Sequence, residues 1–75
     1  MEGWSLKSPM PGTVLEVLVN VGDEVEQGTV LVIVEAVKME NELEAQCGGI
    51  VKEVKVKEGD FVNLGEELAV VTQKS

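Results

Sequence analysis

The residues best suited to chemistry lie in one short segment, Glu35-Ala36-Val37-Lys38-Met39-Glu40, which has a lysine at its centre. No glycine, aspartate or proline stands between Glu35 and Met39, so the segment lacks the residues that usually make a turn. Val37 and Met39 place apolar side chains on either side of Lys38. Apolar residues on an exposed turn indicate that another molecule recognises it. An ordinary solvated lysine is the alternative interpretation.

The composition excludes most forms of self-contained catalysis. Histidine and tyrosine are both absent, which removes the usual general base, the Ser-His and Cys-His nucleophile pairs and the commonest metal ligand. We therefore expect no catalytic residue and no metal site, and a chain that carries something rather than an enzyme. Cys47 is the only cysteine, so an intrachain disulfide is impossible. We expect it to be a small, semi-buried residue before the Gly48-Gly49 turn.

The charge balance is acidic, with fourteen Asp and Glu residues against six Lys, and a net charge of −8. This balance argues against nucleic-acid binding, which depends on neutralising phosphates. No apolar run is long enough to cross a bilayer, and the start of the chain does not resemble a signal peptide. We expect a monomeric domain without direct membrane insertion, located in the cytoplasm, or in the mitochondrial matrix if the source is a eukaryote.

An internal repeat organises the chain. Moving the sequence by 37 positions places residues 12–35 on residues 49–72, with identical residues at many positions, including Gly22-Asp23 on Gly59-Asp60. The same offset places Met1 on Lys38. The 75 residues therefore predict one domain of two halves, about 1–37 and 38–74, and a hairpin between the halves must turn at Lys38.

The repeat and the alternation of apolar residues predict an all-β fold. The expected strands cover residues 3–8, 13–19, 24–27, 29–36, 39–45, 50–56, 61–64 and 67–72. Two four-stranded antiparallel sheets with an internal two-fold pseudosymmetry, closed as a flattened β-barrel or sandwich, satisfy the repeat and protect most strand edges. In that arrangement the Lys38 hairpin protrudes at one end, and the chain termini lie near the other.

The repeat also predicts which side chains face inward. Val14 and Val17 are valine in both halves, whereas Leu15 and Leu18 are replaced by lysine in the second half. We therefore place the two leucines toward solvent. The step from Val14 to Val17 breaks the two-residue period of a strand, which predicts a bulge or bend between them.

Three sequence features together resemble the biotinyl domains of biotin-dependent carboxylases and decarboxylases, and more loosely the lipoyl domains of 2-oxo-acid dehydrogenases. These features are Ser8-Pro9-Met10-Pro11-Gly12, the two Val-x-x-Gly-Asp turns, and the segment around Lys38. The resemblance runs from about Leu6 to Val71. It implies a flattened barrel of two four-stranded sheets, in agreement with the repeat, and makes Lys38 the residue to which the cofactor is attached.

The resemblance implies a biotin carboxyl carrier domain, without catalysis of its own, which shuttles CO₂ as carboxybiotin between partner active sites. The implied partners are a biotin–protein ligase, which attaches biotin to Lys38, a biotin carboxylase, and a carboxyltransferase or decarboxylase. The neighbours that such partners would recognise are Glu35, Ala36, Val37, Met39 and Glu40. Ala36 and Met39 match the biotinyl pattern, whereas Val37 stands where methionine is usual.

Two alternatives stay open at this point. One is a lipoyl carrier of the 2-oxo-acid dehydrogenase or glycine-cleavage type, although lipoyl domains usually have aspartate before the lysine and alanine after it. The other is an interaction module of the same fold whose lysine is never modified. The identity of Val37 gives this second alternative some weight.

Overall fold

A computed structural model describes residues 3–73, and within this range the chain forms eight strands and no helix. The strands are β1 (Gly3–Lys7), β2 (Gly12–Val17), β3 (Glu24–Val25), β4 (Val30–Ala36), β5 (Met39–Glu44), β6 (Gly49–Val54), β7 (Phe61–Val62) and β8 (Glu67–Thr72). All eight expected strands are present, with ends that differ from the prediction by up to two residues. The all-β prediction is therefore confirmed.

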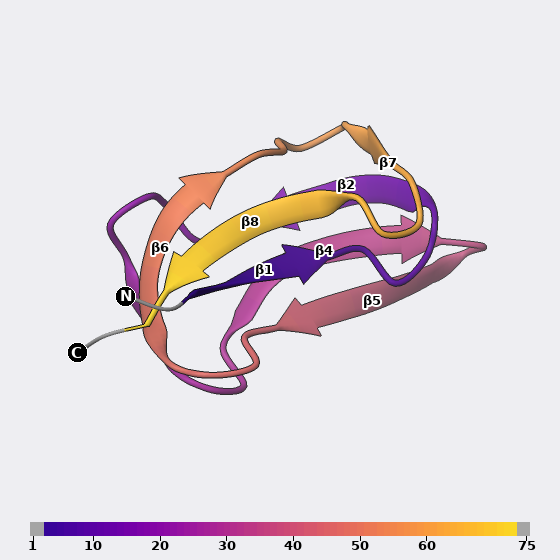
Figure 1. Cartoon of the computed structure of the whole chain (residues 1–75). Helices are drawn as coiled ribbons and strands as arrows, with labels where there is room; N and C mark the ends of the chain where they lie inside the picture. Colours follow the sequence, from indigo (N-terminus) through magenta and orange to yellow (C-terminus); the bar gives the residue numbers. More distant parts are fainter. Residues whose placement is uncertain (1–2, 74–75) are drawn as a thin grey trace.

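The strands form two antiparallel four-stranded sheets, in the orders β1-β8-β6-β3 and β5-β4-β2-β7. Each strand of one sheet has its repeat mate at the same place in the other: β1 corresponds to β5, β8 to β4, β6 to β2, and β3 to β7. Figure 1 shows the two sheets packed face to face. The expected two-fold pseudosymmetry is thus present. Met1, the predicted mate of Lys38, lies outside the described residues.

The predicted bulge occurs in both halves. The register of β2 on β4 shifts between Val14 and Glu16, and the register of β6 on β8 shifts between Val51 and Glu53. As expected, Leu18 is exposed. Leu15 is half-buried rather than exposed, because it is the extra residue of the bulge, where a side chain is turned away from the regular outward direction.

The core lies between the two sheets and consists almost entirely of valine and leucine. Its fully buried members include Val14 and Val51, which are repeat mates, each with 1% of its surface exposed. Trp4 is half-buried and packs against this core. The prediction for Cys47 was wrong, since it is exposed. The chain leaves the core at Ala45, which is buried, and Gly48 has no side chain to cover Cys47.

Two matching glycine turns hold the halves together. Gly22 and Gly59 have φ values of 97° and 92°, in the left-handed region that favours glycine. The Gly22 N–H donates to the Val51 carbonyl and the Gly59 N–H donates to the Val14 carbonyl, both at 2.8 Å. Each turn is therefore bonded to the strand of the other half, which fixes the two sheets relative to each other.

The resulting barrel is elongated, measuring 38 × 17 × 17 Å. The β4–β5 hairpin forms one narrow end, and the start of β1 and the end of β8 form the other, where Gly3 pairs with Thr72 (Figure 1). The expected placement of the lysine hairpin, away from the first and last described residues, is confirmed.

Candidate functional site

The candidate site is the tip of the β4–β5 hairpin. Ala36 at the end of β4 pairs with Met39 at the start of β5, so the loop consists of Val37 and Lys38 alone. Both residues have positive φ, 49° and 66°. This is the backbone of the tight two-residue turn that normally selects asparagine or glycine. Neither valine nor lysine favours it, which is why the sequence predicted a hairpin here but not its turn geometry.

The strand pairing below the tip forces this turn. β4 and β5 stay paired from Val30 and Glu44 up to Ala36 and Met39. The side-chain amide of Asn41 adds long hydrogen bonds to the carbonyls of Val34 and Met39, at 3.5 and 3.4 Å. Sequence reasoning missed this role. The signal was present, because Asn41 is a polar residue at an inward position of an otherwise alternating strand.

The lysine is open to solvent. Lys38 is exposed, and its neighbours Val37 and Met39 are 93% and 66% exposed. Within residues 3–73, the Lys38 ammonium makes no hydrogen bond and no ion pair, even though Glu35 and Glu40 lie on the same hairpin. A primary amine is thus presented at the end of the barrel, between two exposed apolar side chains.

The structure brings all the sequence-predicted neighbours of Lys38 together on this hairpin. Glu35 and Glu40 are directly paired across β4 and β5, and both are exposed. Ala36 also lies on the hairpin but is not exposed like the other neighbours, because only 8% of its surface is exposed and its side chain points into the barrel. Its contribution is to anchor the last strand pair before the turn, rather than to offer a surface to a partner.

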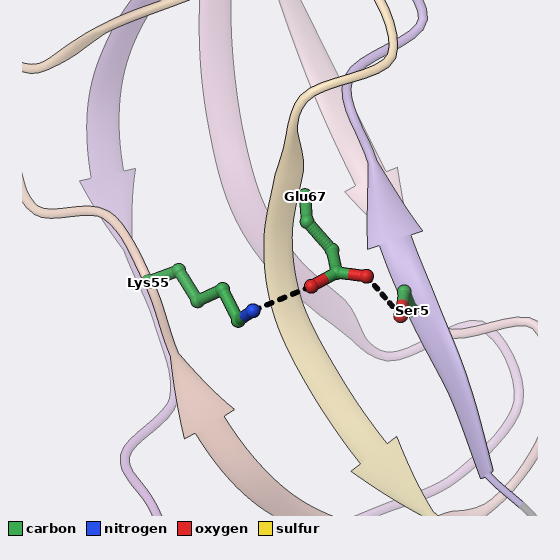
Figure 2. Close-up of polar contacts among 3 residues, drawn as sticks. All are labelled: Ser5, Lys55 and Glu67. Carbon is green, nitrogen blue, oxygen red and sulfur yellow. Dashed lines mark hydrogen bonds and ion pairs between the residues drawn. The ribbon is translucent and has the colours of Figure 1, made fainter.

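Charged groups on the opposite sheet pair with one another instead. The Lys55 Nζ lies 2.6 Å from an oxygen of Glu67, and the Ser5 hydroxyl donates to the other oxygen at 2.7 Å (Figure 2). The hydrogen bond between Lys55 and Glu67 raises the pKa of the lysine and lowers the pKa of the carboxyl, which the Ser5 hydroxyl lowers further. This network links β1, β8 and the segment after β6, and its groups are already satisfied.

An open groove of about 500 Å³ lies elsewhere, between repeat mates that include Val17 with Val54 and Val19 with Val56. It does not include Lys38, so the lysine is offered on a tip rather than in that groove. Over residues 3–73, no cluster of three or more His, Cys, Asp or Glu side chains is arranged to hold a metal ion. The same range contains no helix of the length and apolarity that a membrane span requires.

Comparison with known proteins places this architecture in a family. The biotin/lipoyl family model, described as "Biotin-requiring enzyme", matches residues 5–71. The chain is 48% identical over 67 residues to the biotin carboxyl carrier protein of Streptococcus mutans, an alignment that covers 89% of this chain and 52% of that protein. It is 51% identical over 59 residues to the biotin/lipoyl attachment protein of Bacillus subtilis, covering 79% and 81%.

Solved structures agree with the sequence comparisons. A single-chain, multi-domain long-chain acyl-CoA carboxylase matches with a TM-score of 0.90 and 33% identity, over 96% of this chain and 7% of the other. The urea carboxylase of Kluyveromyces lactis matches with a TM-score of 0.88 and 34% identity, over 95% and 6%. The chain thus spans about half the length of its S. mutans relative, and a small part of these carboxylases. By sequence, fold and lysine hairpin together, it belongs to the biotin/lipoyl attachment family.

Proposed function

We propose that this chain is a biotin carboxyl carrier domain, in which biotin is joined by an amide bond to the Nζ atom of Lys38. The observation that carries the proposal is an exposed lysine, free of partners within the described residues, at the apex of a two-residue hairpin. Biotin is favoured over lipoate because Ala36 and Met39 match the biotinyl pattern. The relatives named biotin carboxyl carrier protein support the same choice.

The residues at the tip fit such an attachment. Nζ makes no hydrogen bond or ion pair within residues 3–73 that acylation would have to break, and the amide removes the lysine charge. The exposed Val37 and Met39 then continue the apolar character of the modified side chain. Lys38 does not line the groove described above, and it is exposed at the tip of the hairpin.

Biotin, once attached, supplies a ring nitrogen that takes up a carboxyl group and gives it back. The chain's own residues do the positioning. The ladder from Val30 to Met39 holds the hairpin, and a tip that is already ordered loses less conformational entropy when it docks. Tethering makes each delivery intramolecular and so raises the effective concentration of the carried group. The domain is therefore a non-catalytic carrier, and the bond-making groups belong to its partners.

Three partners follow from this function. A biotin–protein ligase modifies Lys38, a biotin carboxylase loads the carboxyl group, and a carboxyltransferase or decarboxylase receives it. The similarity to carboxylases that contain such a domain within a much longer chain supports the second and third partners. The cytoplasm or the mitochondrial matrix, where such ligases would act, is the location that we predict.

The test is the intact mass of the protein after expression with a biotin–protein ligase and free biotin. We expect one biotinyl group on the parent and none on Lys38→Ala or Lys38→Arg. The arginine variant keeps the charge of the tip but offers no amine that the ligase can acylate. A lipoyl group added only in the matching lipoate experiment would assign the chain to the lipoyl class. No modification in either experiment would refute the carrier function.

A further inference from the structure

The outer face of the lysine-bearing sheet differs sharply in charge from that of the other sheet. Five exposed glutamates lie at outward positions of β5, β4 and β2, and we call them the acidic face. They are Glu16, Glu35, Glu40, Glu42 and Glu44. None of these three strands carries a lysine or arginine. No ion pair or hydrogen bond to any of the five carboxylates is found within residues 3–73.

The repeat provides an internal control for this charge. The five mates on the other sheet, at the same positions of the same fold, are Glu53, Thr72, Gly3, Ser5 and Lys7. They carry one glutamate and one lysine, and therefore no net charge. The fold is built equally well with no net charge at these positions, so its formation does not require the acidic face.

Protection of the sheet edge explains only part of the pattern. β5 is an edge strand, and charged side chains there discourage pairing with another chain. However, Glu35 lies on β4 and Glu16 on β2, which are both interior strands. Glu35 also stands directly opposite Glu40, and like charges in that position destabilise a sheet. The opposed pair of Glu35 and Glu40 lowers the stability of the free domain and is absent from the mate sheet. Its presence therefore indicates a role in binding another molecule rather than in folding.

An exposed aromatic ring completes the face. Phe61 of β7 pairs with Thr13, which pairs with Glu35, so one outward row crosses all four strands from Phe61 to Glu40. Phe61 is 62% exposed, and its mate on the other sheet is Glu24. Aromatic residues are enriched in protein interfaces, where they often contribute much of the binding energy. This row lies one residue pair below the Ala36–Met39 pair, so it is continuous with the Lys38 tip.

From this arrangement we infer that the acidic face together with Phe61 docks on a basic surface beside the active site of the biotin carboxylase partner. The inference rests on the proposed function and deepens it. A site that handles bicarbonate and transfers a carboxyl group binds anions, so cationic side chains gather there. Opposite charges then steer the domain into place and orient it with Lys38 forward, while Phe61 supplies apolar contact.

The test compares two double variants that change the net charge equally. Glu42→Gln/Glu44→Gln removes two charges from the acidic face, at about 13 and 20 Å from Lys38 along the strand. Glu53→Gln/Glu58→Gln removes two exposed charges elsewhere. Phe61→Ala is matched by Val21→Ala, which truncates another exposed apolar residue. Intact mass confirms biotinylation of every variant, and thermal melting confirms folding.

The probe is a purified biotin carboxylase subunit of an acetyl-CoA carboxylase, supplied with its nucleotide and bicarbonate. We expect the KM for the biotinylated domain to rise about three- to tenfold for the acidic-face variant and for Phe61→Ala, with kcat unchanged and with both controls near the parent value. Raising the salt concentration should weaken the parent more than the acidic-face variant. An NMR titration of the unmodified domain should shift the amides of β4, β5 and β7.

Each other outcome overturns the inference while leaving the mass result for Lys38 intact. An equal KM for the acidic-face variant and its control would show that the face does not dock on this partner. Slower biotinylation with an unchanged KM would assign the face to the ligase. Self-association of the parent that the variant abolishes would assign it to a second copy of the chain. A KM for the parent no lower than that for free biotin would exclude this class of partner.

Discussion

Replacing Val37 with asparagine should stabilise the free domain, because this valine is held in a backbone conformation that suits it poorly. Its φ of 49° lies in the left-handed region. There an L-residue other than glycine loses about 1–2 kcal/mol, and branching at Cβ places valine among the residues that tolerate it least. Asparagine tolerates the left-handed region and is a preferred residue of such turns.

The magnitude follows from how little Val37 buries. The side chain is 93% exposed, so truncating its apolar surface removes only about 0.1–0.2 kcal/mol of burial. The relief of backbone strain therefore dominates, and we expect Val37→Asn to raise the free energy of unfolding by about 1 kcal/mol. For a domain of this size, that corresponds to an increase in Tm of about 4–8 °C. Val37→Gly should gain less, because the added flexibility of glycine in the unfolded chain offsets about 0.5–1 kcal/mol.

Thermal and urea unfolding of the unmodified protein are the assays. The control is Val21→Asn, which makes the same chemical change at another valine, 64% exposed and with ordinary negative φ. Its free energy of unfolding should change by less than about 0.5 kcal/mol. An unchanged or lower Tm for Val37→Asn, or an equal gain in both variants, would show that the turn is not strained and that the reasoning from φ is wrong.

Three further predictions concern the tip, the core and the ion pair. Val37→Met should raise the rate of biotin ligation without altering the fold, because methionine is longer and unbranched at Cβ. The rate is measured by intact mass over time, and a rate equal to or below that of the parent would show that valine does not slow ligation. Val14→Ala and Val51→Ala should each cost about 2 kcal/mol in urea unfolding, and a large inequality between these mates would contradict the equivalence of the two halves. Glu67→Gln should lower the Tm slightly at neutral pH. In the folded protein the pKa of Glu67 lies below its ordinary value of 4.5 and the pKa of Lys55 lies above its ordinary value of 10.5. The ion pair therefore stabilises the folded state at pH values between these two ordinary values. The difference in Tm should vanish as the pH falls through the folded pKa of Glu67, and a difference that persists in strong acid would exclude the ion pair as its cause.

The repeat made most of the fold predictable from the sequence. Residues kept in both halves marked the structure that the barrel requires: the Gly22 and Gly59 turns, the inward Val14 and Val51, and the bulge that follows each of these valines. Each assignment in one half was checked by its mate in the other. Two side chains were misplaced. Cys47 is exposed, and neither the strand period nor the repeat specifies whether a neighbouring segment covers that position. Leu15 is half-buried because it is the extra residue of the bulge, and the predicted bulge did not by itself fix the direction of that side chain.

The position of the candidate site on the hairpin was predictable, but its geometry was not. The exposed hairpin and Lys38 followed from the junction of the repeats and from the apolar residues around the lysine. The positive φ values at Val37 and Lys38 did not follow, because these residue types prefer other conformations and adopt this one under the constraint of strand pairing. The one clue in the sequence was the length of the gap between the expected strands, which leaves only residues 37 and 38 for the loop. A two-residue hairpin loop requires positive φ.

The comparison of the two halves separates what the fold needs from what its function adds. Gly12 and Gly49 are mates, and a Cβ on either would collide with a backbone carbonyl of the neighbouring strand, Glu35 in one half and Thr72 in the other. Glycine is therefore required at the same position in both halves, because both sheets have the same close contact there. Among residues 3–73, the strained Val37-Lys38 turn and the opposed pair of Glu35 and Glu40 occur on the lysine-bearing sheet alone, and both lower the stability of the free domain. Since Thr72 and Gly3 occupy the positions of that glutamate pair on the other sheet, the barrel folds without it. Selection for stability alone would remove both features, so their presence around one exposed lysine supports the proposal that partners recognise this tip.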